Sequence, residues 1–194
     1  MTDPHSPIAT VARWPQAAVP PAARRQIAAL EREAWPDARS GELAHDEALR
    51  PVCLALLEGE VVVAALAVLS KPLEHDGERY AASGLSAVVT DPRRRRRGHG
   101  TRLVKAGLAL MREAGVDLGL LTCDAELVAF YEGAGWTALP GAVLVGGTPA
   151  APLPSDGFAK TVMATFLSDR ARRNAAAFRR ARIELYPGTI DRLW

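Results

Sequence analysis

The sequence lacks the features that several protein classes require. Only two cysteines occur in 194 residues, Cys53 and Cys123, which excludes a disulfide-stabilised scaffold. The longest apolar run, Val61–Leu69, is about half of the roughly 20 residues that a membrane-spanning helix needs. The first residues contain no basic segment followed by a long apolar one, as a signal peptide would. We therefore expect a cytoplasmic protein without a membrane segment.

Aromatic residues and net charge are also scarce. The chain has 4 Trp, 3 Tyr and 4 Phe, and its 24 Lys and Arg are nearly balanced by 22 Asp and Glu. A nucleic-acid-binding module would need a basic field and aromatic residues among its basic ones. Positive charge is only local here, in Arg93–Arg97 and across Arg170–Arg182, so nucleic-acid binding stays an unfavoured alternative. The four histidines have no metal-ligand spacing, and we expect no metal.

The hydrophobic pattern predicts one α/β (α+β) domain over residues 1–194, with a mixed, mostly antiparallel sheet flanked by helices. Residues 1–20 are expected to form an extended lead-in, and residues 168–194 a basic helix and tail. Turns at Glu58-Gly59-Glu60 and Asp76-Gly77 separate three antiparallel strands. The expected strands are Val52–Leu57, Val61–Leu69, Tyr80–Thr90, Val116–Cys123, Trp136–Leu139, Ala142–Val145 and Phe158–Leu167. The expected helices are Ala22–Ala34, a short one near Glu42–Leu49, Thr101–Ala114, Glu126–Ala134 and Ser168–Arg182, and Gly146–Gly157 is expected to be a loop.

A turn with five arginines and two glycines joins a predicted strand to a predicted helix. Arg95-Arg96-Arg97-Gly98-His99-Gly100 lies between the strand ending near Thr90 and the helix starting near Thr101. Unpaired backbone N–H groups at a helix N-terminus attract anions, and glycine lets a phosphate approach the backbone. The spacing is neither that of a Walker loop nor that of a dinucleotide fingerprint. The turn therefore predicts a phosphate site of another kind.

A second motif, Ala129-Phe130-Tyr131-Glu132-Gly133-Ala134-Gly135-Trp136, follows downstream. The order and spacing of Arg-x-x-Gly-x-Gly and this block resemble the GNAT superfamily of acyl-CoA-dependent N-acetyltransferases. Within it, Leu139-Pro140-Gly141, the proline-rich loop, Asp156-Gly157-Phe158 and the terminal Asp191 and Trp194 are similar to the aminoglycoside 2'-N-acetyltransferase branch. The resemblance covers about Val52–Trp194. It implies the GNAT fold, a small amine as acceptor and a homodimer.

The resemblance also implies that acetyl-CoA is the acyl donor and that the turn holds its pyrophosphate. The strand Ser86–Thr90 is expected to carry a bulge and to part from its parallel neighbour near Thr122. A bulge frees backbone groups, which here would contact the pantetheine and thioester. The residues expected to contact acetyl-CoA are Val88, Val89, Thr90, Arg95, Arg96, Arg97, Gly98, His99, Gly100 and Thr101.

Tyr131 is the candidate general acid. A phenol can donate a proton to the thiolate that leaves during acetyl transfer, and the resemblance places this tyrosine near the sulfur. The alternative is a core tyrosine on the buried face of a helix. A GNAT-like fold that binds acyl-CoA without transferring the acyl group is the alternative for the whole protein.

The acceptor side offers several polar residues but no identifiable general base. Ser86 stands where the aminoglycoside branch has a substrate-binding Glu, so that carboxylate is missing here. The aspartates could instead be solvated turn residues, Trp194 a packing residue and Cys123 a buried thiol. The acceptor-facing candidates are Asp37, Ser86, Thr122, Cys123, Asp156, Asp191 and Trp194.

Overall fold

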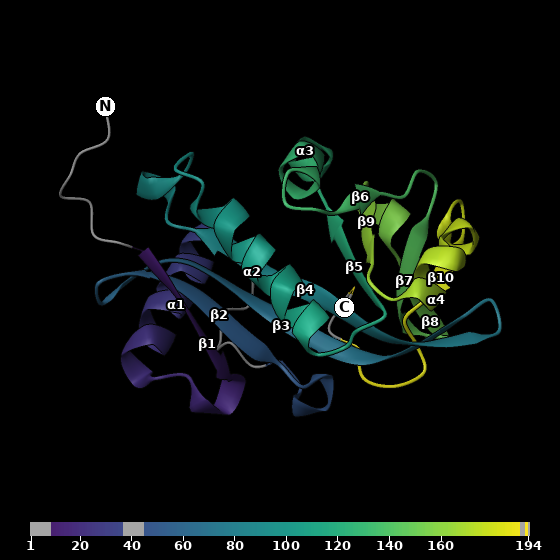
Figure 1. The fold of residues 1–194 in the computed structure, drawn as a ribbon, viewed down its shortest axis with the longest axis horizontal. Coiled ribbons are helices and arrows are strands. Elements are labelled where there is room, and N and C mark those ends of the chain that lie inside the picture. Colours follow the sequence, from purple (N-terminus) through teal and green to yellow (C-terminus); the bar gives the residue numbers. More distant parts are fainter. Residues whose placement is uncertain (1–8, 37–44, 191–192, 194) are drawn as a thin grey trace.

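A seven-stranded sheet organises the protein (Figure 1). The structure, a computed structural model, describes residues 9–36, 45–190 and 193. The strand order is β1-β2-β3-β4-β5-β9-β6, and a second sheet has the order β10-β7-β8. The strands are β1 (Ala9–Pro15), β2 (Val52–Glu58), β3 (Val61–His75), β4 (Glu78–Thr90), β5 (Leu118–Cys123), β6 (Thr137–Ala138), β7 (Val143–Thr148), β8 (Ala151–Pro154), β9 (Thr161–Phe166) and β10 (Arg182–Glu184). The α-helices are α1 (Pro21–Ala34), α2 (His99–Glu113), α3 (Val128–Glu132) and α4 (Asp169–Arg173), and the 3-10 turns are η1 (Gln16–Ala18), η2 (Glu47–Leu49), η3 (Pro92–Arg94), η4 (Ala125–Leu127), η5 (Ser155–Phe158) and η6 (Ala175–Phe178).

Two helices cover opposite faces of the sheet, and both were predicted from their apolar spacing. Helix α1 starts after Pro20, and its side chains Ile27 and Leu30 pack on the face that carries Cys53 and Ala65. Helix α2 buries its apolar stripe against Leu66 and Val68 on the other face (Figure 1). The expected α/β class, with a mostly antiparallel sheet and flanking helices, is confirmed. No helix in the described part of the chain is long and apolar enough to cross a membrane.

Strand β4 carries the predicted bulge. Ser86 pairs with Ala67 and Val89 pairs with Ala65, so β4 has one more residue than β3 over this interval. The extra residue is accommodated at Ala87, whose φ of 51° lies in the left-handed region. A bulge releases local backbone groups from the ladder and bends the strand. The ladder is therefore interrupted at the end of β4 that leads to the arginine turn.

The parallel strands β4 and β5 are paired over only two residue pairs, Ala82 with Leu118 and Ser83 with Gly119. Beyond them β4 remains paired with β3, and β5 remains paired with β9 as far as Cys123. Because each strand keeps a different partner, the two diverge and leave a wedge-shaped opening. We expected the parting near Thr122, and it occurs earlier, just after Gly119.

Asp117 anchors the paired end of these two strands. Its N–H donates to the carbonyl of Ala81 at 2.8 Å, and its Oδ2 accepts from the N–H of Ala81 at 2.9 Å. Arg170 of α4 donates to the same oxygen at 2.6 Å. Although burial opposes ionisation of Asp117, hydrogen bonds from Ser168, Ala81 and Arg170 hold its pKa below the usual value. The junction of β4 and β5 is thus fixed at one end and open at the other.

The predicted basic helix over Ser168–Arg182 was wrong. Helix α4 ends at Arg173, a 3-10 turn follows, and the chain then enters β10. Phe178 explains the interruption, because its fully buried ring contacts Tyr80 and Phe166 and draws the backbone towards the core. Arginine composition alone could not indicate this contact.

Two other expectations also differ from the structure. The lead-in contains an edge strand, β1, which pairs along the whole of β2. The loop expected over Gly146–Gly157 is largely the hairpin of β7 and β8, in which Gly147 of β7 has a φ of 75° and a Cβ there would clash with the carbonyl oxygen of Ala151. Short edge strands with exposed side chains have weak sequence patterns. Of the helix expected near Glu42–Leu49, the described part is the 3-10 turn Glu47–Leu49.

Lys71 fixes the C-terminal segment to β3. Its side chain is 5% exposed, and its Nζ donates to the carbonyl oxygens of Leu185 and Thr189, the latter at 2.8 Å. Nζ also lies 3.4 Å from the carbonyl oxygen of Pro187. A buried ammonium requires such acceptors. The segment after β10 is therefore tied to the central sheet.

Gly119, at the parting point of β4 and β5, should not tolerate a side chain. A Cβ there would lie 2.8 Å from Cγ2 of Thr165 and 2.9 Å from the indole ring of Trp136. We expect Gly119→Ala to lower the free energy of unfolding by about 1–3 kcal/mol through overpacking. Urea denaturation measures this change. Gly157→Ala, where a Cβ meets nothing within 4 Å, is the matched control, and equal stability of the two variants would contradict the close packing at Gly119.

Candidate functional site

A cleft of about 530 Å³ lies at the end of β4, between the start of α2 and α3. Its volume lies within the range of roughly 300–1,000 Å³ typical of ligand sites. Four elements contribute to it: the end of α1, the end of β4, the start of α2 with its preceding turn, and α3. The lining residues are Ala34, Trp35, Val88, Val89, Thr90, Arg95, Arg96, Gly98, His99, Gly100, Thr101, Leu127, Phe130 and Tyr131.

The structure brings nearly all the expected acetyl-CoA contacts together in this cleft. Nine of the ten residues line it, from Val88 at the bulge to Thr101 in the first turn of α2. The exception is Arg97, which does not line the cleft. The candidate general acid, Tyr131, lines the same cleft. Two motifs that lie about 30 residues apart in the sequence thus share one space.

The turn before α2 has the geometry of an anion site. Gly98 is the N-cap of α2 with a φ of 79°, and Arg96 also has a positive φ, of 62°. The N–H of Arg102 makes the first helical bond, to Gly98 O at 2.9 Å, so the N–H groups of the preceding helical residues remain unpaired within the helix. A Cβ on Gly98 would meet no atom within 4 Å. Space for an anion therefore lies directly beside the backbone.

Gly100 is needed for a different reason. A Cβ at this position would lie 3.1 Å from Oγ1 of Thr90 and 3.2 Å from Cε2 of Phe130. The end of β4, the start of α2 and the side of α3 therefore meet at a residue without a side chain. This close approach sets the width of the cleft at its base.

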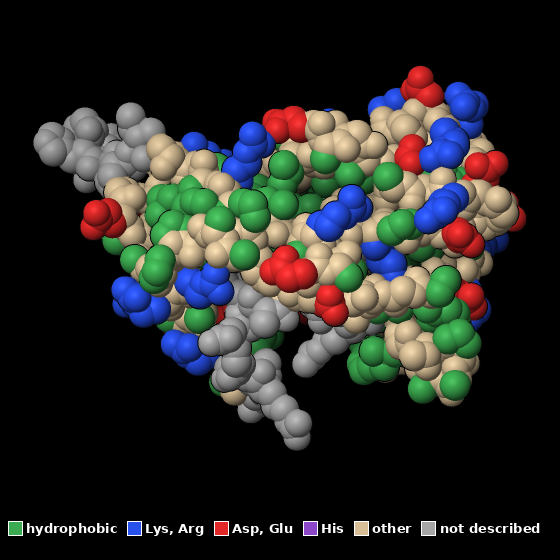
Figure 2. Space-filling model, turned by 90° about the horizontal axis from the view of Figure 1, so that it is seen from below, with side chains coloured by type: hydrophobic (Ala, Val, Ile, Leu, Met, Phe, Trp, Pro, Cys, Tyr) green, Lys and Arg blue, Asp and Glu red, His purple; other side chains and the backbone are tan. Residues whose placement is uncertain are grey.

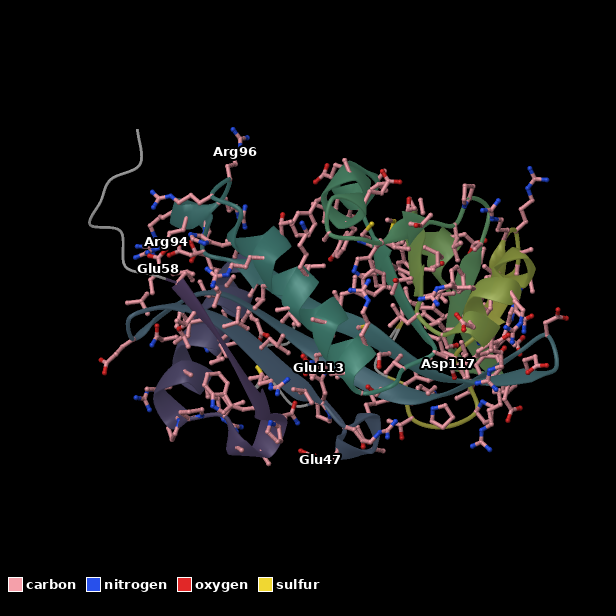
Figure 3. The ribbon with its side chains drawn as sticks, in the orientation of Figure 1. Glu47, Glu58, Arg94, Arg96, Glu113 and Asp117 are labelled. Atoms are coloured by element: carbon pink, nitrogen blue, oxygen red, sulfur yellow. The ribbon has the colours of Figure 1, made fainter. Side chains whose placement is uncertain are left out.

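The five arginines have separate surroundings. Arg95 and Arg96 line the cleft, and Arg96 points away from the ribbon into solvent in Figure 3. Arg93 is exposed, and its Nε lies 3.4 Å from Oδ1 of Asp91. The side chain of Arg94 is only 30% exposed and binds Glu58 at the end of β2. One arginine of the run is thus structural, and two line the cleft.

Tyr131 is 6% exposed and packs edge-on against Phe130 and Trp136. Burial raises its pKa well above the ordinary value, and Cys123 and Asp124 add to the shift. The described residues give its hydroxyl no hydrogen-bond partner. The phenol is therefore protonated at neutral pH and can donate to a group in the cleft.

The expected acceptor residues are only partly assembled. Ser86 and Thr122 are half-buried strand residues, and the buried Cys123 lies close enough to Tyr131 to affect its pKa. Asp156 is exposed in η5, where its Oδ1 accepts from Gly157 N–H at 3.0 Å. None of these four lines the cleft. Asp37, Asp191 and Trp194 lie outside the described residues.

Several lining residues were not predicted. Ala34 and Trp35, at the end of α1, form part of the cleft together with Leu127 and Phe130. Trp35 is 42% exposed, which is unusual for so large an apolar side chain and is consistent with a binding surface. A tryptophan before Pro36 at a helix end was the available sequence signal. Among the described residues, no group of three or more His, Cys, Asp or Glu is placed to hold a metal ion.

Glu31, one helical turn before Ala34, was also missed. Its Oε1 is buried and has no hydrogen-bond partner in the described part of the chain. Burial raises the pKa of Glu31 to about 7, and His45 partly opposes this shift. A carboxyl group that titrates near neutral pH therefore lies beside the end of α1.

The fold and the site define a class of protein: a mixed sheet whose central parallel strands part beside a glycine turn at the start of a helix. A family model described as an acetyltransferase (GNAT) domain matches residues 19–139. The match spans more than half of the chain, so the protein belongs to the GNAT acetyltransferase family. A search of curated proteins found no match.

Solved structures share this fold at low sequence identity. Escherichia coli ElaA is 14% identical, with 81% of this chain and 99% of that chain covered and a TM-score of 0.57. A GNAT family acetyltransferase from Brucella melitensis, solved with acetyl-CoA, is 25% identical over 66% of this chain and 84% of that chain, with a TM-score of 0.50. A probable N-acyltransferase from Enterococcus faecalis is 18% identical over 68% of this chain, with a TM-score of 0.54, and this chain spans only 33% of it.

Glu31 should make stability depend on pH. Because its folded pKa of about 7 exceeds the ordinary 4.5, the folded state holds the proton more tightly, and stability falls as pH rises between these values. Partial exposure and screening reduce the effect to about 1 kcal/mol, or about 2–4 °C in melting temperature. We expect Glu31→Gln to remove that part of the decline, as measured by thermal unfolding at acidic and alkaline pH. The exposed Glu33→Gln is the control, and an unchanged pH dependence in Glu31→Gln would contradict the assignment.

Proposed function

We propose that the protein transfers an acetyl group from acetyl-CoA to a primary amine of a small molecule. The observation that supports this most is the meeting of three features around one cleft: the glycine turn before α2, the bulge in β4 and Tyr131. Each supplies a different requirement of the reaction, namely a site for the pyrophosphate, backbone groups for the thioester and a proton donor for the thiolate. Membership of the GNAT family and the acetyl-CoA complex of the Brucella protein support the same donor.

The reaction follows from the positions of these groups. The amine nitrogen attacks the thioester carbonyl carbon, and the carbon–sulfur bond breaks. Backbone groups near Val88 and Val89 stabilise the oxyanion in between. Tyr131 gives its proton to the departing sulfur, and the proton lost by the amine restores the phenol through solvent. The products are an amide and the free thiol of CoA.

We propose an aminoglycoside-like amine as the acceptor, because of the sequence resemblance to that branch. Asp124 directly follows β5, but its Oδ1 already accepts from Lys160 at 2.6 Å, and neither Asp124 nor the exposed Asp156 lines the cleft, so the resemblance alone carries this choice of acceptor. A screen of aminoglycosides, polyamines and other amines with acetyl-CoA, in which the release of the CoA thiol is measured, identifies the acceptor. Binding of acetyl-CoA without thiol release for any amine would instead favour a non-catalytic binding protein.

The charge of the chain supports a small ligand over nucleic acid as the partner, because 24 Lys and Arg are nearly balanced by 22 Asp and Glu. On the face shown in Figure 2, basic and acidic side chains are interspersed instead of forming one basic surface. A phosphate backbone is bound by a continuous basic surface. The exposed arginines beside the cleft instead suit the phosphates of one small ligand.

Gly98→Glu should abolish most of the acetyl-CoA affinity. The side chain would place bulk and negative charge in the open space beside the turn, where we place the pyrophosphate. We expect a loss of roughly tenfold to a hundredfold by calorimetry, as for like charges in contact with a bound anion. Gly115→Glu is the matched control, because Gly115 also has a positive φ and open space but lies at the other end of α2. Equal affinities of the two variants would remove the turn from the donor site.

Tyr131→Phe should lower kcat far more than it weakens acetyl-CoA binding. Loss of a general acid typically costs about 10²–10⁴-fold in rate, and the phenyl ring keeps the packing with Phe130 and Trp136. We expect the dissociation constant of acetyl-CoA to change by about twofold or less. Tyr80→Phe, which removes only the hydrogen bond from Asn174 in the core, controls for a general loss of stability. An unaltered kcat in Tyr131→Phe would exclude Tyr131 from proton transfer.

A further inference from the structure

His99, the first residue of helix α2, faces the carboxylate of Glu58 at the end of strand β2. Nε2 of His99 lies 3.3 Å from Oε1 of Glu58, and the two side chains are 12% and 13% exposed. The geometry of this contact is not that of a hydrogen bond, and Nε2 has no hydrogen-bond partner within the described chain. His99 also lines the cleft. A titratable ring thus stands between a buried acid and the space assigned to the donor's phosphates.

The same carboxylate holds the segment that leads into the turn. Arg94 donates to Glu58, and its Nε lies 3.6 Å from Oδ2 of Asp91. Asp91 caps η3 by accepting from the N–H of Arg93 at 2.9 Å. Figure 3 shows Glu58 and Arg94 together at one end of the sheet, away from the outward-pointing Arg96. Glu58 therefore connects β2, η3 and the start of α2.

The charges around His99 favour its neutral form in the free protein. Burial lowers its pKa, and Arg97, Arg94 and Arg102 lower it further. Glu58 is the acidic group that faces it from β2, and Arg94 competes for that carboxylate. The groups facing the ring thus come from β2, η3, the turn and α2 itself.

We propose that His99 takes up a proton when acetyl-CoA binds, and that the resulting imidazolium is held between the carboxylate of Glu58 and the pyrophosphate. In this arrangement Nε2–H donates to Oε1 of Glu58, which supplies the hydrogen bond that the ring now lacks. Glu58 is a positioning residue, because it acts on the ligand through Arg94 and His99. The inference rests on the donor site proposed above.

The physical reason is the change in net charge at the turn. In the free protein the nearby guanidinium groups repel a proton from the ring, whereas a bound pyrophosphate neutralises them and attracts the proton. The pKa of His99 is therefore higher in the complex than in the free protein. By linkage, this contribution to affinity is fully present below the free-state pKa and is lost as pH rises through the bound-state pKa, by up to about tenfold per pH unit.

Calorimetry with acetyl-CoA directly tests the proposed uptake of a proton on binding. Titrations at one pH in buffers with different ionisation enthalpies give the number of protons taken up, and a series from about pH 5.5 to 8.5 brackets the titration of a histidine. We expect the wild type to take up a substantial fraction of one proton at slightly acidic pH. His99→Gln should bind acetyl-CoA with no proton uptake and a flat pH profile. His75→Gln, in which the altered ring contacts Ala177 and Phe178 far from the turn, should behave as the wild type.

A second pair of variants tests the positioning role of Glu58. If Glu58 acted only as a negative charge near the phosphates, its removal would strengthen binding. We instead expect Glu58→Gln to weaken acetyl-CoA binding by roughly fivefold or more at slightly acidic pH and to reduce the proton uptake. Glu60→Gln removes an exposed carboxylate two residues away and should change neither. If Glu58→Gln does not fold, the ring pKa of His99, followed by NMR in the wild type, must still rise on adding acetyl-CoA.

The outcomes separate this inference from the proposed function. Binding without proton uptake, or uptake that persists in His99→Gln, would overturn the role of His99 and leave the donor site intact. Tighter binding by Glu58→Gln would overturn the positioning role. Absence of any acetyl-CoA binding to the wild type would overturn the inference together with the proposed function.

Discussion

The site depends on the limited pairing of β4 and β5. Two residue pairs, ending at Ser83 and Gly119, join these parallel strands, and Asp117 fixes that end with hydrogen bonds to β4 and α4. Beyond Gly119, β4 stays paired with β3 and β5 stays paired with β9. Both strands therefore keep hydrogen-bonded partners on the sides that face away from the opening. The bulge at Ala87 then interrupts the ladder between β4 and β3 and bends the end of β4. The sheet can therefore open here because β4 and β5 each stay paired with their other neighbour.

The arginines of the turn have different surroundings, which the sequence composition does not show. Arg94 is bound by Glu58 and helps to order the turn, Arg95 and Arg96 line the cleft, and Arg93 stays in solvent. Order in the turn matters because an anion site requires its backbone N–H groups to be positioned before the ligand arrives. The carboxylate of Glu58 would repel an anion in the neighbouring turn, and its bond to Arg94 gives it a structural role there.

Much of the fold could be predicted from the sequence, because the central strands and the helices α1 and α2 have clear apolar periodicity. The two motifs and the strand before the first one also predicted most of the lining of the cleft, because the glycines fix the position of the turn between strand and helix. The remainder depends on contacts between distant segments. Phe178 ends the expected basic helix, Trp35 and Ala34 reach the cleft from α1, and Glu58 faces His99 across 41 positions of the chain. The acceptor residues stay predictions, because Ser86, Thr122, Cys123 and Asp156 do not line the cleft and the other three lie outside the described residues.

The central claim is that the cleft between β4 and α2 binds acetyl-CoA. Two-dimensional NMR spectra of the nitrogen-15-labelled protein, recorded while acetyl-CoA is added, report on each backbone N–H separately. The account predicts the largest shifts at the N–H groups of Gly98–Thr101, with further shifts at Val88 and Val89. Unchanged resonances at Gly98–Thr101, with saturable shifts elsewhere or none at all, would contradict it.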